Sequence, residues 1–274
     1  MLRFVQSADG TRLAVREAGD PTAPPIVLVH GWAASGQAWV NQLTDPELTA
    51  RHRLLAVDLR GHGESDIPGG NLDGYADPAV WADDLAAVLA YADAPAVLVG
   101  WSYGGLVVTD YLRERGSSGV AGLVLVGAVT EIGRDRPGGA LGSAWNVGMR
   151  AALSDDVTVA APALAAIAAD QTAEPRSGTE IQHSLGQMLQ VPPAVRKALF
   201  ERDQGGLDAV TVPTLVLHGE LDRVVAPAAG EYAAGKIPGA SMRWFSRTGH
   251  MPFVERVAEF NAALLEFAGS VAAH

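Results

Sequence analysis

Short runs of consecutive apolar residues alternate along the chain with longer stretches in which apolar residues recur every three or four positions. The apolar runs occupy residues 26–29, 54–57, 97–99 and 120–126, and further strands are predicted at 212–217 and 241–246. Uninterrupted apolar runs of this length are typical of strands buried on both faces, and the intervening spacing is typical of amphipathic helices. The alternation therefore predicts an α/β fold, with a doubly wound, mostly parallel sheet of about eight strands.

Both ends of the chain add elements to this pattern. Residues 3–5 and 13–16 flank the turn dipeptide Asp9-Gly10, which predicts an N-terminal antiparallel hairpin. Asp77 followed by Pro78 predicts the start of a helix, because aspartate is a common N-cap and proline fits the first helical position. A closing helix is predicted by apolar residues that share one face: Phe253, Val257, Phe260, Leu264 and Phe267.

One segment breaks the alternation. Residues 131–206 have no strong strand pattern, only alanine-rich helical stretches interrupted by prolines at 137, 162, 175, 192 and 193. A structureless loop of this length is rare in a compact domain, and the aliphatic content of the segment argues against disorder. We therefore expect a core domain made of residues 1–130 and 207–274, with a helical cap, or lid, of residues 131–206 inserted after the sixth strand.

Charge and composition exclude several kinds of partner. The 274 residues have a net charge of −11, without any block of basic residues, so no nucleic-acid partner is expected. The chain has no cysteine, which excludes disulfides and thiolate metal sites. Residues 2–6 lack the pattern of a signal peptide, and the alanine-rich stretch 160–169 is too short to span a bilayer. We expect a cytoplasmic protein without a membrane partner.

The chemistry centres on the sequence Gly100-Trp101-Ser102-Tyr103-Gly104, which stands where an apolar run ends and a helical pattern begins. This is the G-x-S-x-G pattern of a nucleophile elbow, a tight strand-to-helix turn that exposes a serine hydroxyl. A side chain at Gly100 or Gly104 would collide with the neighbouring backbone, so glycine is the residue expected there. Ser102 is the candidate nucleophile.

A serine hydroxyl needs a base to activate it, and that base needs a carboxylate to orient it. Asp222 follows the strand predicted at 212–217 and His250 follows the one predicted at 241–246, which gives the chain order serine, acid, histidine. Both would lie at the carboxyl ends of parallel strands, where open α/β sheets bind ligands. We predict a triad of Ser102, Asp222 and His250, with Glu220 and Glu131 as alternatives for the acid.

An oxyanion hole requires two backbone N–H groups directed at the site where negative charge develops. We expect one from Tyr103, the residue after the nucleophile, and one from Trp32, in the loop after the run at 26–29. Large apolar side chains are the candidates for substrate contact: Trp32, Tyr103, Trp145, Met188 and Met251.

Other motifs give weak signals. Gly61 and Gly63 form half of a dinucleotide-binding fingerprint, but Asp66 stands where the third glycine belongs. We interpret three residues of this loop as ion-paired scaffolding: Asp58, Arg60 and His62. A metal site is not supported by carboxylate spacing near the candidate histidines His30, His62, His218 and His250. We expect no metal and no cofactor.

The motifs together resemble those of the α/β-hydrolase superfamily over nearly the whole chain. They stand in the order of that family: His30-Gly31, 58–66, 100–104, 218–222 and Gly249-His250. Within the superfamily, the combination of His30-Gly31-Trp32 with Gly100-Trp101-Ser102 is similar to a group of carboxylesterases. The loop 31–39 is also similar to that of the cofactor-free haloperoxidases, which are esterases with perhydrolase side activity.

The resemblance implies acyl transfer, because the members that displace alkyl groups use an aspartate where this chain has Ser102. We predict a serine hydrolase that cleaves a carboxylic ester or lactone of a small to medium, largely hydrophobic substrate through an acyl-enzyme intermediate. Perhydrolase or haloperoxidase-type activity and C–C bond hydrolysis on the same triad are alternatives. A ligand receptor without turnover is the alternative from another class. The sequence does not indicate the oligomeric state.

Overall fold

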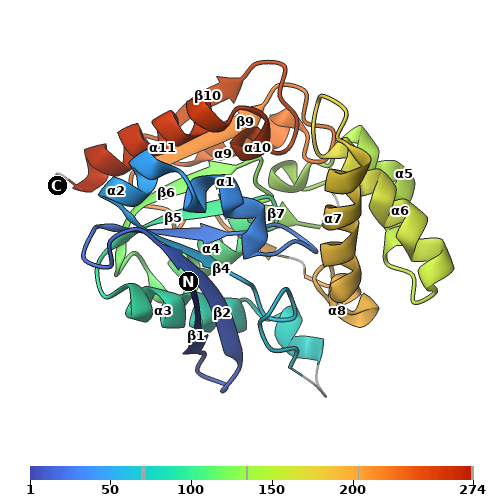
Figure 1. Cartoon of the computed structure of the whole chain (residues 1–274), viewed down its shortest axis with the longest axis horizontal. Coiled ribbons are helices and arrows are strands. Elements are labelled where there is room, and N and C mark those ends of the chain that lie inside the picture. Colours follow the sequence, from blue (N-terminus) through green and yellow to red (C-terminus); the bar gives the residue numbers. More distant parts are fainter. Residues whose placement is uncertain (69–71, 134, 203, 273–274) are drawn as a thin grey trace.

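The computed structural model of the chain describes residues 1–68, 72–133, 135–202 and 204–272 (Figure 1). An eight-stranded sheet runs through the molecule in the order β1-β2-β4-β3-β5-β6-β9-β10. Its strands are β1 (Leu2–Gln6), β2 (Arg12–Ala18), β3 (Pro25–Val29), β4 (Arg53–Val57), β5 (Ala96–Trp101), β6 (Val120–Val126), β9 (Thr214–Gly219) and β10 (Ser241–Phe245). The strands from β4 to β10 run parallel, whereas β1 and β2 pair as the predicted antiparallel hairpin. The predicted fold class is confirmed.

Helices cover both faces of the sheet (Figure 1). One face carries α3 (Pro78–Ala92), α4 (Gly104–Arg115) and α9 (Pro227–Lys236), and the other carries α1 (Val40–Leu43), α2 (Pro46–Arg51), α10 (Pro252–Glu255) and α11 (Val257–Ala272). In β3, Val27 and Val29 pack in the core beneath α3, α4 and α9, while Ile26 and Leu28 pack in the core on the opposite face of the sheet. The apolar runs are continuous because side chains on both faces of these strands are buried.

The end of the chain differs from the expected single helix. Arg256 has the non-helical backbone angles φ −134° and ψ 54°, and it separates α10 from α11. Both helices still present an aromatic side chain to Trp39: Phe253 lies 4.4 Å and Phe260 6.3 Å from its ring centroid. The predicted apolar face is therefore kept, although the helix is divided.

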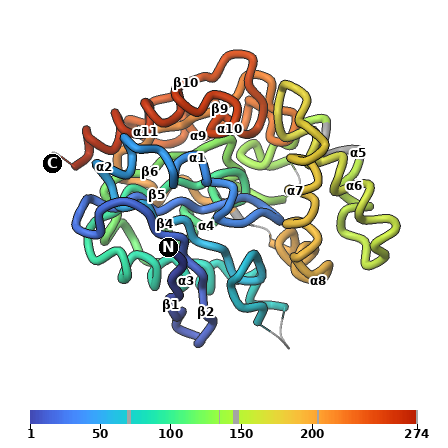
Figure 2. The backbone as a smooth tube through the Cα atoms, viewed as in Figure 1, coloured from blue at the N-terminus to red at the C-terminus, as the bar shows by residue number. Residues whose placement is uncertain are grey.

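The described part of residues 131–206 contains four α-helices, and they lie together at one side of the molecule (Figure 2). They are α5 (Ser143–Ala152), α6 (Val157–Asp170), α7 (Gly178–Gln190) and α8 (Pro193–Ala198). Pro162 lies inside α6 instead of ending a helix. The segment also begins and ends in two strands too short to leave a sequence pattern, β7 (Glu131–Ile132) and β8 (Gln204–Gly205), which pair antiparallel.

Three short 3-10 helices complete the described structure: η1 (Gly36–Trp39), η2 (Leu72–Tyr75) and η3 (Pro137–Gly139). Asp77 caps α3 as predicted, because its carboxylate accepts a hydrogen bond from the backbone N–H of Ala79. None of the helices in the described ranges combines the length and the apolar character that crossing a membrane requires.

Candidate active site

Ser102 sits in the turn between β5 and α4 with a left-handed backbone, φ +55°. The turn requires the two flanking glycines. A Cβ on Gly100 would lie 2.7 Å from the carbonyl oxygen of Gly104, and a Cβ on Gly104 would lie 2.6 Å from the carbonyl oxygen of Val29. The left-handed backbone of Ser102 is strained for a non-glycine residue, and residues in such conformations are concentrated at functional sites. The turn thus holds the Ser102 side chain at the carboxyl edge of the sheet.

Asp222 and His250 meet at the same edge. Asp222 follows β9 and His250 follows β10, and these strands are parallel neighbours. The Nδ1 atom of His250 lies 2.7 Å from Oδ2 of Asp222 in a buried hydrogen bond. The other oxygen, Oδ1, accepts hydrogen bonds from the backbone N–H groups of Val224 at 2.8 Å and Val225 at 2.9 Å. The carboxylate is therefore fixed on both oxygens.

The charge of Asp222 is favoured by the same contacts. Burial acts to raise the pKa of this carboxyl group, but the facing His250 ring and the histidine hydrogen bonds outweigh it. The pKa of Asp222 consequently lies well below its ordinary value. An ionised acid next to a histidine is the arrangement that orients a general base and stabilises its cation.

His250 is joined to the elbow through the residue before the nucleophile. The indole N–H of Trp101 donates to the backbone carbonyl of His250 at 3.0 Å, and the two rings lie 5.4 Å apart. Gly127 leaves room for the acid–base pair, since a Cβ there would lie 3.1 Å from both Asp222 Oδ2 and His250 Nδ1. Within the described residues, no direct hydrogen bond joins the Ser102 hydroxyl to the His250 ring.

The two alternative acids occupy other positions. Glu220 is exposed. The carboxylate of Glu131 accepts hydrogen bonds from the Tyr232 hydroxyl at 3.1 Å and from the backbone N–H of Gly138 at 2.9 Å. Of the three carboxylates that the sequence left open, Asp222 is the one that contacts His250.

The loop after β3 lies directly against the candidate nucleophile. A Cβ on Gly31 would come within 2.8 Å of Ser102 Cβ and 3.3 Å of its hydroxyl oxygen. The next residue is Trp32, and Ala33 holds a left-handed backbone at φ +53° that turns the loop away. Tyr103 stands at the head of α4, immediately after Ser102. The two predicted oxyanion residues thus flank the serine on separate elements.

A cavity of about 90 Å³ opens at Ser102. Its walls are mostly apolar: Trp32, Tyr103, Val129, Ile132, Leu141, Phe200, Val224 and Val225, with Glu131 and two glycines. Trp32 and Tyr103 were predicted from the sequence to be among these residues, and Glu131 was considered only as an alternative acid. The others come from four separate segments and share no motif, although Ile132, Leu141 and Phe200, as apolar residues of the 131–206 segment, offered a signal.

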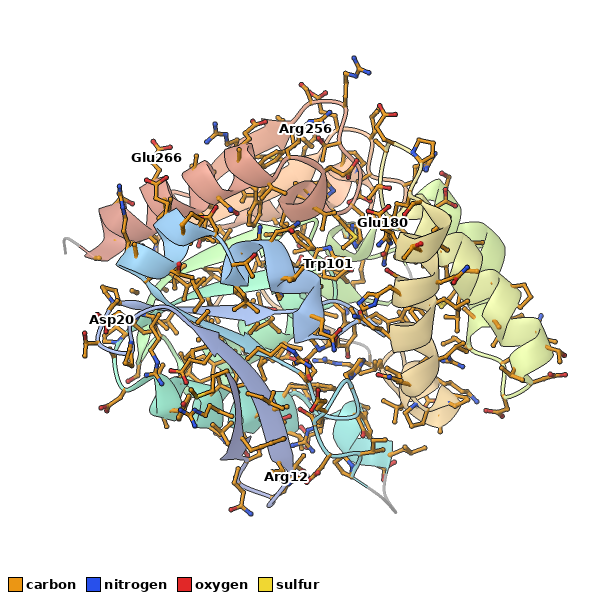
Figure 3. The ribbon with its side chains drawn as sticks, in the orientation of Figure 1. Arg12, Asp20, Trp101, Glu180, Arg256 and Glu266 are labelled. Atoms are coloured by element: carbon orange, nitrogen blue, oxygen red, sulfur yellow. The ribbon has the colours of Figure 1, made fainter. Side chains whose placement is uncertain are left out.

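The predicted methionines line a different hollow, of about 220 Å³. Met188 on α7 and Met251 after His250 both line it, and Ser102 is not among its lining residues. Trp101 and Glu180, labelled in Figure 3, border the same hollow from the core and from α7. The side chain of Trp145, on α5, lies outside the described residues. Of the four predicted substrate-contacting residues whose side chains are described, the structure therefore brings two to the cavity at Ser102.

Both oxyanion candidates are tied to the 131–206 segment by their side chains. The indole N–H of Trp32 donates to the backbone carbonyl of Arg196 at 3.1 Å. The Tyr103 hydroxyl donates to the carbonyl of Leu199 at 3.2 Å and accepts from Arg202 at 3.0 Å. Arg202 also forms a fully buried ion pair with Asp110 on α4. The segment is thus anchored at the residues next to the nucleophile.

Three residues of the loop 58–66 were interpreted from the sequence as ion-paired scaffolding, and two of them, Asp58 and Arg60, form ion pairs. Asp58 pairs with Arg16 at 2.7 Å, and Arg60 forms a buried pair with Asp84 at 2.5 Å. His62 instead bonds through Nδ1 to the carbonyl of Arg60 at 2.9 Å. In the part of the chain that the structure describes, no group of three or more histidine, aspartate or glutamate side chains is arranged to hold a metal ion.

Comparison with known proteins identifies the family. The sequence profile of the alpha/beta hydrolase family matches residues 26–263, and the chain belongs to that family. A crystal structure of an esterase from Rhodococcus sp. ECU1013 superimposes with a TM-score of 0.91 at 42% identity, covering 98% of this chain and 99% of that one.

Two further relatives are similar to this chain in sequence; one is named as an esterase and the other as a haloperoxidase. The pimeloyl-[acyl-carrier protein] methyl ester esterase of Aromatoleum aromaticum is 32% identical over 89% of this chain and 97% of its own length. A non-heme haloperoxidase of Rhodococcus erythropolis is 31% identical over 96% of this chain and 98% of its own. The chain is a hydrolase-family enzyme on an α/β-hydrolase scaffold, with esterase-like relatives.

Proposed function

We propose that the protein is a serine esterase that cleaves a small carboxylic ester through an acyl-enzyme intermediate. The observation that carries this proposal is the buried 2.7 Å hydrogen bond between His250 and Asp222, at the sheet edge that presents Ser102 in a left-handed turn. An acid-oriented histidine beside a serine in a nucleophile elbow is the arrangement that acyl transfer requires.

In the proposed reaction the Ser102 hydroxyl attacks the acyl carbon while Nε2 of His250 takes the hydroxyl proton. The carbonyl π electrons move to oxygen, and backbone N–H groups of Trp32 and Tyr103 stabilise that oxyanion. When the oxyanion collapses, the ester C–O bond breaks and His250 returns the proton to the leaving alkoxide. Water then repeats the sequence on the acyl-enzyme, releasing the acid and restoring Ser102.

The cavity limits the acyl group. It measures about 90 Å³, and a cavity of roughly 150 Å³ in another protein holds one benzene molecule. Acyl chains of about two to four carbons therefore fit without displacement of the walls. Because the lining is mostly apolar, aliphatic acyl groups are favoured over hydroxylated ones.

We further propose that residues 131–206 form a cap on a core domain of residues 1–130 and 207–274. Support comes from Phe200, which lines the cavity and lies 5.8 Å from the Trp32 ring, and from the backbone carbonyls of Arg196 and Leu199 that accept hydrogen bonds from the two oxyanion residues. The cap thereby supplies one wall of the acyl cavity.

The test is the hydrolysis of p-nitrophenyl esters from acetate to dodecanoate by the wild type and by Ser102→Ala. We expect kcat/KM to peak between acetate and butyrate, to fall for longer chains, and to vanish into the background in the variant. Turnover that survives in folded Ser102→Ala would overturn the mechanism. A peak at octanoate or beyond would leave the mechanism intact but refute the small acyl cavity.

Perhydrolysis is a second candidate, favoured by the 31% identical haloperoxidase of Rhodococcus erythropolis. Hydrogen peroxide would replace water in the second half of the reaction, so that its oxygen attacks the acyl-enzyme and a peracid leaves. Peracid formed from p-nitrophenyl acetate and peroxide should depend on Ser102 in the same way as ester hydrolysis. Peracid formation in the absence of Ser102 would exclude this route.

A further inference from the structure

A second histidine contacts the acid of the proposed triad from the interior of the protein. His218 lies near the end of β9 and its side chain is completely buried. Its Nε2 atom is 3.3 Å from Oδ2 of Asp222 and 3.2 Å from the backbone carbonyl oxygen of Val225. Oδ2 of Asp222 therefore lies between two imidazoles, with His250 on the side of the active site.

The neighbours of His218 determine its protonation. Both atoms near Nε2 are acceptors, a carboxylate oxygen and a carbonyl oxygen, so the hydrogen-bond network assigns a proton to Nε2. Nδ1 is buried and has no hydrogen-bond partner in the described part of the chain. A proton at Nδ1 would be a buried donor without an acceptor, which is costly. His218 is accordingly assigned as the neutral Nε2–H tautomer.

Within the described residues, the other contacts of His218 are uncharged. On the α9 side, a Cβ on Gly230 would lie 2.5 Å from Nδ1, and on the β10 side the Trp244 ring lies 5.9 Å away. Arg223, next to Asp222 in the chain, directs its guanidinium to Asp170 at 3.0 Å. The ionisable groups in contact with this arrangement are thus Asp222 and, through it, His250.

We propose that His218 is a positioning residue for the acid of the triad: its Nε2–H shares Oδ2 of Asp222 with His250 and limits the strength with which Asp222 holds a proton on His250. The proposal rests on the proposed esterase function of this site. Four N–H donors then surround the carboxylate, two histidines on Oδ2 and two backbone amides on Oδ1.

This role differs from simple packing in the direction of its effect on pH dependence. When the Nε2–H donor is removed, more negative charge stays on Oδ2 for His250, and His250 keeps its proton to higher pH. Since the base must be neutral to accept the Ser102 proton, the acid limb of kcat/KM moves to higher pH. A packing defect that loosens Asp222 would instead weaken its hold on the His250 proton and move the limb to lower pH.

The experiment compares the pH dependence of kcat/KM for p-nitrophenyl acetate in the wild type, His218→Gln and His218→Met. Glutamine keeps an N–H donor at a similar reach, whereas methionine fills a similar volume without one. We expect His218→Met to move the acid limb up by about half a pH unit or more, and His218→Gln to stay near the wild type. His52→Gln, between α2 and β4 and outside this site, serves as the control.

A His218→Met profile that superimposes on the wild type, or moves to lower pH, would overturn the proposal. A second measurement needs no variant: long-range ¹H–¹⁵N correlation of the wild-type imidazoles from pH 5.5 to 8.5. We expect His218 to stay a neutral Nε2–H tautomer throughout this range. A His218 that is charged or carries its proton on Nδ1 would refute the proposal. If ester hydrolysis does not depend on Ser102, the proposed function fails, while the tautomer result still decides the state of His218.

Discussion

The Nδ1 atom of His250 and the Oδ2 atom of Asp222 lie 2.7 Å apart, although 28 residues separate them in the chain. They meet because each follows one of two adjacent parallel strands, β9 and β10. Gly127, after β6, leaves the space that the pair occupies. The sheet topology, rather than the loops alone, brings the acid to the base.

Replacing Asp222 with Asn should remove the acid while keeping its shape. We expect kcat for p-nitrophenyl acetate to fall by about 10³- to 10⁴-fold, because the amide favours the wrong tautomer of the histidine. Glu131→Gln is the matched control, since Glu131 bonds Tyr232 and Gly138 instead of His250. Steady-state kinetics with a circular dichroism check decides, and a greater loss in Glu131→Gln would show that Asp222 is not the acid.

Gly104→Ala should destabilise the elbow. The new methyl group would lie 2.6 Å from the Val29 carbonyl oxygen and 2.8 Å from that of His30, so backbone must move. We expect a loss of about 1–3 kcal/mol in the free energy of unfolding, measured by urea denaturation. Gly186→Ala, in the exposed part of α7 with open space around it, should instead gain up to about 1 kcal/mol. Equal effects in the two variants would refute the steric account.

Acid should destabilise the protein through His30 and His62, whose rings lie 5.1 Å apart in the core. Burial lowers the pKa of His30 to about 4 and that of His62 to about 3, from 6.5. A lowered histidine pKa stabilises the fold fully above pH 6.5, and this stability is lost as the pH falls from 6.5 toward those values, because the unfolded chain binds protons first.

The comparison that isolates this effect uses His62→Met. Between pH 7.5 and 5, we expect the unfolding free energy of the variant to fall by about 2 kcal/mol less than that of the wild type, since one histidine of this pair is gone. Urea denaturation at both pH values provides the measurement. Parallel losses in the two proteins would mean that His62 is not held neutral by burial.

Arg202→Met should be strongly destabilising. The substitution leaves the buried carboxylate of Asp110 with Arg113 alone and removes the donor to the Tyr103 hydroxyl. Breaking a buried ion pair from one side typically costs about 3–5 kcal/mol. Arg12→Met, which breaks an exposed pair with Asp66, should cost less than about 1 kcal/mol. Urea denaturation that gives Arg202→Met a loss as small as the control would contradict the role assigned to this pair.

Much of the fold could be predicted from the sequence because its signals are local. The run 26–29 is continuous since both faces of β3 are buried, and the hairpin follows from Asp9-Gly10, where Gly10 has φ +89°. The elbow could also be predicted, because the motif around Ser102 is local and Gly100 avoids a collision with the carbonyl oxygen of Gly104, four residues further on. Patterns set by neighbouring residues are visible in one sequence.

The remaining features depend on distant contacts. Nothing near Arg256 in the sequence marks the break between α10 and α11, and β7 pairs with β8 across more than seventy residues. The walls of the cavity come from separate segments, so Val129 and Val224 carried no recognisable motif, while Met188 and Met251 lie in the other hollow. Size and apolar character alone do not tell which side chains face Ser102.

The most direct test of the account is stoichiometric labelling with diethyl p-nitrophenyl phosphate, followed by intact-mass measurement and peptide mapping. An activated serine attacks phosphorus and releases p-nitrophenolate, leaving one diethyl phosphoryl group on its oxygen. We predict one label per chain, on the peptide that contains Ser102, with ester hydrolysis lost in proportion and no label in Ser102→Ala. A label on another residue, or ester hydrolysis that persists in fully labelled protein, would contradict the assignment of Ser102 as the nucleophile.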